Sequence, residues 1–280
     1  MRTHAFLPSI VTHDIFLLRK VMKMFKNQPI GVFDSGVGGL TVLESLMEAF
    51  PNDDFIYIAD HGHCPYGIKQ PEEIINRVEI LGKYLLSKNV KAIVIACNTA
   101  SLFVDHLRSM TNILVLSVIQ PTVNYALLTT KNNRIGVIGT IATIKAGIYQ
   151  QAIENQNVYS HGIACSEFVD IIENDEISHP KTNEMVKTKL SPFQSLDIDT
   201  LIYGCTHFSI LEEQIKAVLG PINYISCGYP TSLELLKYLS PTKIKRKRNI
   251  YIYTTGKVDK LSYNMKWFKK EHLPIQKLDI

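Results

Sequence analysis

Two short polar segments place a cysteine beside residues that can assist proton transfer. Residues 97–99 are Cys-Asn-Thr, and residues 205–207 are Cys-Thr-His. A free thiol titrates near pH ~8.5, so it can act as a thiolate base or as a thiol acid. Two thiols on opposite sides of a carbon α to a carboxylate could remove a proton from one face and return one to the other. This chemistry requires a fold that brings Cys97 and Cys205 together.

Each cysteine follows an apolar segment typical of a buried parallel strand. Ala92–Ala96 precedes Cys97, and Thr200–Tyr203 leads to Gly204 and Cys205. Asn98, Thr99 and Ser101 can cap a helix over residues 100–110. Cys97 would then lie at the carboxyl end of a strand and at a helix start, where ligands bind and where the helix dipole lowers a thiol pKa. Alone, the segment fits a small buried cysteine equally well.

The rest of the chain alternates between strand and helix patterns. Strands are predicted at residues 29–33, 55–59, 91–96, 113–117, 134–138, 200–203 and 249–253. Helices are predicted at residues 40–50, 71–87, 100–110, 140–151, 166–174, 180–193, 210–219 and 258–270. This alternation is typical of a doubly wound parallel sheet.

Two pairs of similar segments indicate an internal duplication. Ile30–Ser35 resembles Ile135–Thr140 at an offset of 105 residues, and Ala96–Thr99 resembles Gly204–His207 at an offset of 108. Duplicated α/β halves normally place their strand ends on a shared cleft. We therefore predict an α/β fold of two pseudo-symmetric, doubly wound parallel-sheet domains with the active site between them.

Length and composition support a two-domain globular protein. The chain has 280 residues, of which 46% are hydrophobic and 20% charged. We predict an N-terminal extension at residues 1–28, a first domain of residues 29–121 plus 229–280, and a second domain of residues 122–228. No apolar run reaches the roughly 18 residues of a membrane span, and no clean secretory signal is evident. We expect a cytoplasmic protein without a membrane partner.

Cysteine count and charge distribution narrow the function classes. The five cysteines form no C-x-x-C pair, so we expect reduced thiols, with Cys64, Cys165 and Cys227 structural. Residues 237–280 hold 12 basic and 3 acidic residues, so the remainder of the chain is close to −5. The basic run at residues 243–248 could bind nucleic acid, but it fits a solvated loop before a strand better. We expect no nucleic-acid partner.

Two further segments have competing interpretations. His61, His63 and Cys64 could hold a metal, but a fourth ligand is missing nearby, and we expect no metal site. The glycine-rich segment Asp34–Gly39 resembles a phosphate loop without the G-x-G-x-x-G spacing. Its glycines are expected to let backbone approach a small ligand.

Polar residues near the two cysteines fit a small zwitterionic ligand. Asp34 and His207 could assist the thiols as proton-handling partners. Carboxylates and an ammonium could be held by the backbone at Tyr66 and Gly67 and by the side chains of Ser35, Asn98, Thr99 and Thr206.

Five motifs together resemble the glutamate racemases of the aspartate/glutamate racemase superfamily. They are Gly31–Thr41, Pro65–Gly67, Ile95–Ser101, Gly136–Thr140 with Thr143, and Gly204–Phe208. They occur in the family's order, and the resemblance spans roughly residues 29 to 273.

The resemblance implies interconversion of L- and D-glutamate without pyridoxal phosphate or metal, in an enzyme that is often a homodimer and supplies D-glutamate for peptidoglycan. It implies that Cys97 and Cys205 are the catalytic acid and base. The implied substrate-binding residues are Asp34, Ser35, Tyr66, Gly67, Asn98, Thr99, Thr206 and His207. Assisting roles are implied for Thr140, Thr143 and Glu173.

The chain departs from the family pattern at three places. Asp60–Cys64 replaces a common Asp-Thr-Ala-Arg segment before Pro-Tyr-Gly, Cys165–Asp170 replaces Cys-Pro-x-Phe-Val-Pro, and Ser209 replaces a proline. These changes leave both cysteines and their binding partners in place, and we expect them to bear on local loop geometry, dimer contacts and any effector response more than on the chemistry.

Three alternatives remain open. An aspartate racemase would share the chemistry, although the Thr-His after Cys205 favours glutamate. A hydrolase could use Cys205 and His207 as nucleophile and base, but the sequence indicates no third, orienting residue. A binding protein could use the basic C-terminal region on nucleic acid.

Overall fold

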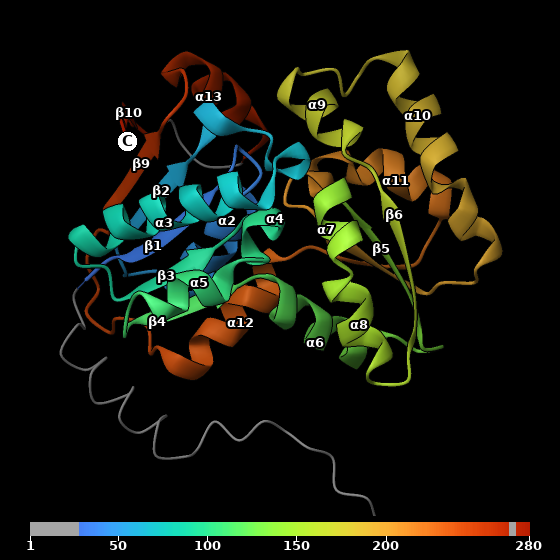
Figure 1. Ribbon diagram of the computed structural model, residues 1–280, viewed down its shortest axis with the longest axis horizontal. Coiled ribbons are helices and arrows are strands. Elements are labelled where there is room, and N and C mark those ends of the chain that lie inside the picture. Colours follow the sequence, from blue (N-terminus) through green and yellow to red (C-terminus); the bar gives the residue numbers. More distant parts are fainter. Residues whose placement is uncertain (1–27, 269–272) are drawn as a thin grey trace, which may run out of the picture.

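The computed structural model describes residues 28–268 and 273–280, which form two parallel β-sheets flanked by helices (Figure 1). Residues 1–27 of the predicted extension lie outside the described part. The first sheet has the strand order β10-β9-β2-β1-β3-β4, with bounds β1 (Ile30–Asp34), β2 (Phe55–Ala59), β3 (Ala92–Ile95), β4 (Leu114–Ser117), β9 (Ile250–Thr254) and β10 (Ile275–Lys277). The second has the order β6-β5-β7-β8, with bounds β5 (Arg134–Gly139), β6 (Tyr159–Ala164), β7 (Thr200–Gly204) and β8 (Asn223–Ile225).

Helices cover both faces of each sheet. Around the first sheet they are α2 (Leu40–Ala49), α3 (Pro71–Ser87), α4 (Asn98–Ser101), α5 (Val104–Ser109), α12 (Gly228–Tyr238) and α13 (Val258–Asn264). Around the second sheet they are α6 (Ile119–Thr129), α7 (Ile141–Ala146), α8 (Ile148–Glu154), α9 (Glu167–Glu173), α10 (Pro180–Leu190) and α11 (Glu212–Leu219). None of these described helices is long and apolar enough to span a membrane.

The central strands β1, β2 and β3 of the first sheet are buried on both faces, because nearly all of their residues are apolar. Along β3, Ala92 and Val94 belong to the cluster that includes α2 and α12, whereas Ile93 and Ile95 belong to the cluster with α3 and α5. Successive strand side chains point to opposite faces, so a continuous apolar run serves two helical layers. The second sheet is divided in the same way, with α9, α10 and α11 on one face and α6 and α8 on the other.

The two sheets share one strand order, as the predicted duplication requires. β1 lies between β2 and β3, followed by β4, and β5 lies between β6 and β7, followed by β8. The residues after β3 and β7 are therefore equivalent, and they include Cys97 and Cys205. The prediction of two parallel-sheet α/β domains is confirmed.

The C-terminal segment returns to the first sheet. β9 pairs in parallel with β2, and β10 pairs with β9. Figure 1 shows these strands at the outer side of the first sheet. This topology is consistent with the predicted domain boundaries after residues 121 and 228, which remain a prediction.

Several predicted helices are shorter than expected. The segment 100–110 forms α4 and α5 rather than one helix, and 140–151 is divided where Gly147 adopts a left-handed φ of 67°. The helix predicted at 258–270 ends at Asn264 and continues as a 3₁₀ turn over Met265–Trp267, and residues 269–270 lie outside the described part. Strands β6, β8 and β10 and helices α6 and α12 were not predicted.

A buried ion pair fixes the loop that follows β2. Asp60 is fully buried, and the Arg77 guanidinium of α3 binds it through Nε and Nη2, both at 2.9 Å. The hydroxyl groups of Tyr66 and Thr255 also donate to the Asp60 carboxylate. Burial alone would raise the pKa of Asp60, but the hydrogen bonds from Arg77, Tyr66 and Thr255 outweigh it and lower the pKa.

We expect Arg77→Met to destabilise the protein by about 3–5 kcal/mol, because it leaves the Asp60 carboxylate buried without its counter-charge. Chemical denaturation measures the change. Lys83→Met is the matched control, because Lys83 lies on the same helix in an exposed pair with Glu79 and should cost less than about 1 kcal/mol. Equal losses in the two variants would contradict the role of the buried pair.

Candidate active site

A small polar cavity lies where strands of both sheets end. The empty space in and at the mouth of this cavity amounts to about 280 Å³. The first sheet and its loops contribute Ser35, Pro65, Tyr66, Gly67, Cys97, Asn98 and Thr99 to its wall. The second sheet and its loops contribute Thr140, Val169, Cys205, Thr206 and His207. The two candidate catalytic thiols therefore line one cavity from different sheets.

Cys97 lies at the N-terminus of α4, between hydrogen-bonding groups of the first sheet. Its Sγ accepts from the backbone N–H of Ala100 at 3.4 Å and donates to Ser35 Oγ at 3.6 Å. Burial and the negative charge of Asp34 raise the pKa of Cys97 to about 12. The predicted lowering by the helix dipole is wrong, because α4 has only four residues and desolvation outweighs its effect.

Cys205 lies directly after β7 and next to a histidine. Its Sγ is 3.8 Å from His207 Nδ1, and His207 Nε2 is 2.9 Å from Oε1 of Glu173. Burial alone would lower the pKa of His207, but its contacts with Cys205 and Glu173 outweigh that effect and raise the pKa well above the usual value. His207 is thus suited to take the Cys205 proton.

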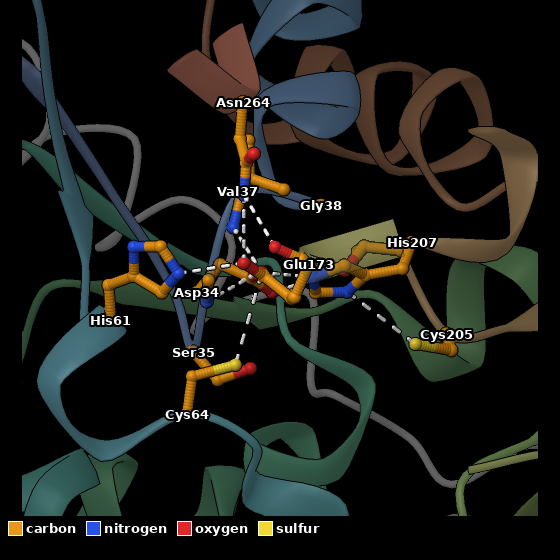
Figure 2. A network of polar contacts seen from close by, with 12 residues as sticks. Asp34, Ser35, Val37, Gly38, His61, Cys64, Glu173, Cys205, His207 and Asn264 are labelled. Carbon is orange, nitrogen blue, oxygen red and sulfur yellow. Dashed lines mark hydrogen bonds and ion pairs between the residues drawn. The ribbon is translucent and has the colours of Figure 1, made fainter. Parts of the chain in front are cut away.

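Glu173, at the end of α9, forms the junction of a buried polar network (Figure 2). Its Oε2 accepts from His61 Nε2 at 2.7 Å and from Asn264 Nδ2 at 3.0 Å, and its Oε1 accepts from the Val37 N–H at 3.4 Å. Burial alone would raise the pKa of Glu173, but the hydrogen bonds from His207 and His61 lower it far below the usual range. The carboxylate is therefore ionised at neutral pH.

Asp34, the last residue of β1, contacts both the glycine-rich segment that follows it and the second domain. Its Oδ2 accepts from the Gly36 N–H at 3.0 Å and its Oδ1 from Thr206 Oγ1 at 3.3 Å. Burial raises the pKa of Asp34, although the charge of His207 opposes the shift. Asp34 does not line the cavity, but it contacts Thr206, which does.

The glycines of this segment lie close to side chains of the second domain. A Cβ on Gly38 would lie 2.6 Å from both Thr206 Oγ1 and His207 Nδ1. A Cβ on Gly36 would lie 2.6 Å from Glu173 Oε1. These glycines thus let side chains of the other domain approach the backbone, which no larger residue permits, and the approach of a small ligand stays a prediction.

Three threonines meet across the two domains. Thr99 Oγ1 lies 3.0 Å from Thr140 Oγ1 and 3.4 Å from Thr143 Oγ1. Thr140 also caps α7, because its Oγ1 accepts from the Thr143 N–H at 3.2 Å. Thr143 lies behind the cavity wall, so it orients Thr140 and Thr99.

Asn98 is held by residues that the sequence did not single out as functional. Tyr149 donates its hydroxyl proton to Asn98 Oδ1 at 2.6 Å, and Asn98 Nδ2 donates to Cys227 Sγ at 3.5 Å. All three side chains are buried. Cys227 therefore orients a cavity residue, which an isolated cysteine in a sequence cannot reveal.

The predicted site residues fall into two groups. Those that line the cavity are Ser35, Tyr66, Gly67, Cys97, Asn98, Thr99, Thr140, Cys205, Thr206 and His207. Asp34, Thr143 and Glu173 contact lining residues from behind. Val169 lines the cavity but was not predicted, since nothing distinguishes it from other apolar core residues.

The histidines of the loop after β2 bind different carboxylates. His61 contacts Glu173, and His63 contacts Asp60 with its Nδ1 at 3.1 Å. Among the residues that the structure describes, no group of three or more His, Cys, Asp or Glu side chains is arranged to hold a metal ion.

Two parallel-sheet domains that each contribute one thiol to a shared polar cavity suit an isomerase that acts on both faces of a carbon. The chain belongs to the Asp/Glu/Hydantoin racemase family, whose model matches residues 30–227. It is 38% identical over 242 residues to a glutamate racemase of Oceanobacillus iheyensis, covering 83% of this chain and 88% of that protein.

Solved structures agree with this assignment. A glutamate racemase isoform from Bacillus anthracis superposes with a TM-score of 0.84 at 33% identity, covering 91% of this chain and 98% of that one. The glutamate racemase of Francisella tularensis, solved in complex with D-glutamate, superposes with a TM-score of 0.82, the same identity and the same coverages.

The effect of Asp34 on Cys97 can be tested by alkylation. We expect Asp34→Asn to speed the reaction of Cys97 with iodoacetamide at pH 8 by about 3–10-fold, because removal of the negative charge favours the thiolate. Peptide mass spectrometry measures the rate. Asp105→Asn, at an exposed side chain of α5, should leave the rate unchanged. A slower or unaltered Cys97 reaction in Asp34→Asn would contradict this electrostatic account.

Proposed function

We propose that this protein interconverts L- and D-glutamate by proton transfer between two thiols, Cys97 and Cys205. The observation that carries the proposal is that both thiols line one polar cavity from different sheets. Each also has its own polar partner, since Cys97 contacts Ser35 and Cys205 contacts His207. Family membership and the glutamate racemases similar over most of the chain support glutamate as the substrate.

The surroundings of the thiols suggest how the first proton transfer begins. His207 accepts the Cys205 proton on Nδ1, which leaves a thiolate beside an imidazolium that Glu173 stabilises. The thiolate removes the α-proton of the substrate. Cys97, whose raised pKa keeps it protonated, then donates its proton to the opposite face of the carbon. The α-proton ends on Cys205, and Cys97 is left as the thiolate.

The end state of one direction is the starting state of the other. With Cys97 as thiolate and Cys205 as thiol, the site can react with the mirror-image substrate by the same steps in reverse. Ser35 stabilises the Cys97 thiolate through its hydroxyl, and the N–H of Ala100 does so from the start of α4. Protons and charge balance without an added acid or redox partner.

Substrate binding is assigned to the polar residues around the thiols. Asn98, Thr99 and Thr206 line the cavity, and Ser35 lies beside Cys97. Asp34 orients the Thr206 side chain by accepting a hydrogen bond from its hydroxyl group.

The physiological setting follows from the resemblance to glutamate racemases. We place the enzyme in the cytoplasm, where it would supply D-glutamate for peptidoglycan synthesis. We also propose a homodimer. Aspartate is the competing substrate, and side-by-side assays with both amino acids separate the two.

A second candidate is a hydrolase that uses Cys205, His207 and Glu173. The three groups form a nucleophile, a base and an orienting carboxylate, a combination that the sequence did not reveal. Such an enzyme would form an acyl intermediate on Cys205 and would not need Cys97. The requirement for Cys97 therefore decides between the two functions.

We expect Cys97→Ala and Cys205→Ala each to lower the rate of glutamate racemisation by at least about 10²–10⁴-fold, the contribution of a general acid or base. Circular dichroism of glutamate follows the reaction. Cys165→Ala is the control, because Cys165 is a buried thiol that does not line the cavity. Full activity in either of the first two variants would rule out the two-thiol mechanism.

A further inference from the structure

His61 contacts the Glu173 carboxylate as a second imidazole, on the side away from His207. Its Nε2 lies 2.7 Å from Glu173 Oε2, and its side chain is only 4% exposed. Figure 2 shows Glu173 between the two histidines. His61 lines a neighbouring pocket of about 360 Å³ rather than the substrate cavity, so it is not placed to contact the substrate.

The two oxygens of Glu173 have different partners. Oε1 faces His207, which contacts Cys205, while Oε2 accepts from His61 and from Asn264. A hydrogen bond donated to one oxygen of a carboxylate withdraws negative charge from the whole group. It therefore weakens the attraction of the other oxygen for a proton or a cation. His61 thus reduces the pull of Glu173 on the His207 imidazolium.

We propose that His61 is a positioning residue that acts on Cys205 through Glu173 and His207. By donating to Glu173 Oε2 it limits the stability of the His207 imidazolium and hence the fraction of Cys205 present as thiolate. The consequence for catalysis rests on the proposed function, because Cys205 must serve as a thiolate base in one direction and as a thiol acid in the other. An overly stable thiolate would slow the step in which Cys205 donates.

The packing around His61 leaves Glu173 as its hydrogen-bonding partner. Within the described residues its Nδ1 has no hydrogen-bond partner. The backbone of Gly256 packs against the Cβ of His61, since a Cβ on Gly256 would lie 2.9 Å from it. The hydrogen bond to Glu173 therefore connects the His61 imidazole to His207 and Cys205.

Other charged or titratable groups also surround this pocket. Asp170 and Glu173 face it from α9, Lys260 from α13 and Cys64 from the loop after β2. Asp60, which precedes His61, and His63, which follows two residues later, are hydrogen-bonded to each other. These groups stay unchanged in a His61 variant, so a change in Cys205 reports the loss of the imidazole.

The test measures the alkylation of Cys205 by iodoacetamide as a function of pH, with peptide mass spectrometry. His61→Leu removes the donor, and we expect the midpoint of Cys205 alkylation to fall by about 0.5–1 pH unit. His61→Gln keeps an N–H donor near Glu173, and its midpoint should stay within about 0.3 unit of the wild type. Where His61→Leu does not fold, His61→Asn is used, because its shorter amide loses the contact while remaining polar.

Two controls isolate the effect. His63→Gln changes the other histidine of the same turn, which is 39% exposed and contacts Asp60, so it should leave the Cys205 midpoint unchanged. The alkylation of Cys97, measured in the same digests, should also stay unchanged.

An unchanged or higher midpoint in His61→Leu or His61→Asn would overturn the proposal, as would a His61→Gln variant that shifts as far as the leucine variant. The assay needs no substrate. A wild-type protein that fails to racemise glutamate would refute the proposed function but would leave the alkylation result standing.

Discussion

The active site depends on one buried carboxylate that joins the two domains. Glu173 belongs to α9 of the second domain, yet Val37, His61 and Asn264 of the first domain donate hydrogen bonds to it. A buried charge is stable only where it is paired and fully hydrogen-bonded. Its ionised state therefore depends on contact between the two domains, and within the second domain Glu173 binds the His207 that lies against Cys205. Contact between the domains therefore helps to keep charged the carboxylate that binds His207.

The two thiols occupy unlike surroundings although they derive from equivalent strand ends. Cys97 is buried beside Asp34, which raises its pKa to about 12 and favours the thiol. Cys205 lies against His207, which can take its proton. Active sites that use one group as an acid and another as a base commonly place the two groups in different surroundings. In the proposed mechanism one thiol acts as the acid and the other as the base, and each turnover exchanges their roles.

The sequence predicts the framework of this site well, because its signals are local. Continuous apolar runs ending at Cys97 and Cys205 mark buried strands, and the repeated segments predict the shared strand order. Helix ends were less predictable, since Gly147 divides one helix by a backbone conformation that no pattern reveals. Short strands such as β8 carry too few residues to show a period.

The network around Glu173 could not be predicted, because its members are far apart in sequence. Glu173 lies 34 residues from His207, 91 from Asn264 and 112 from His61. His61 looked like a weak metal ligand only because His63 and Cys64 are its sequence neighbours. The pKa of Cys97 was predicted in the wrong direction for the same reason, since a local helix start was visible in the sequence and burial by another domain was not.

Racemisation in deuterium oxide tests the two-thiol account most directly. Started from either pure enantiomer of glutamate and stopped early, the reaction should yield product with deuterium on the α-carbon, while the remaining substrate keeps its protium. That pattern follows because one thiol removes the proton and a different, solvent-exchanged thiol replaces it on the other face. Product that retains the original protium would show a single base returning the same proton, and it would contradict the account.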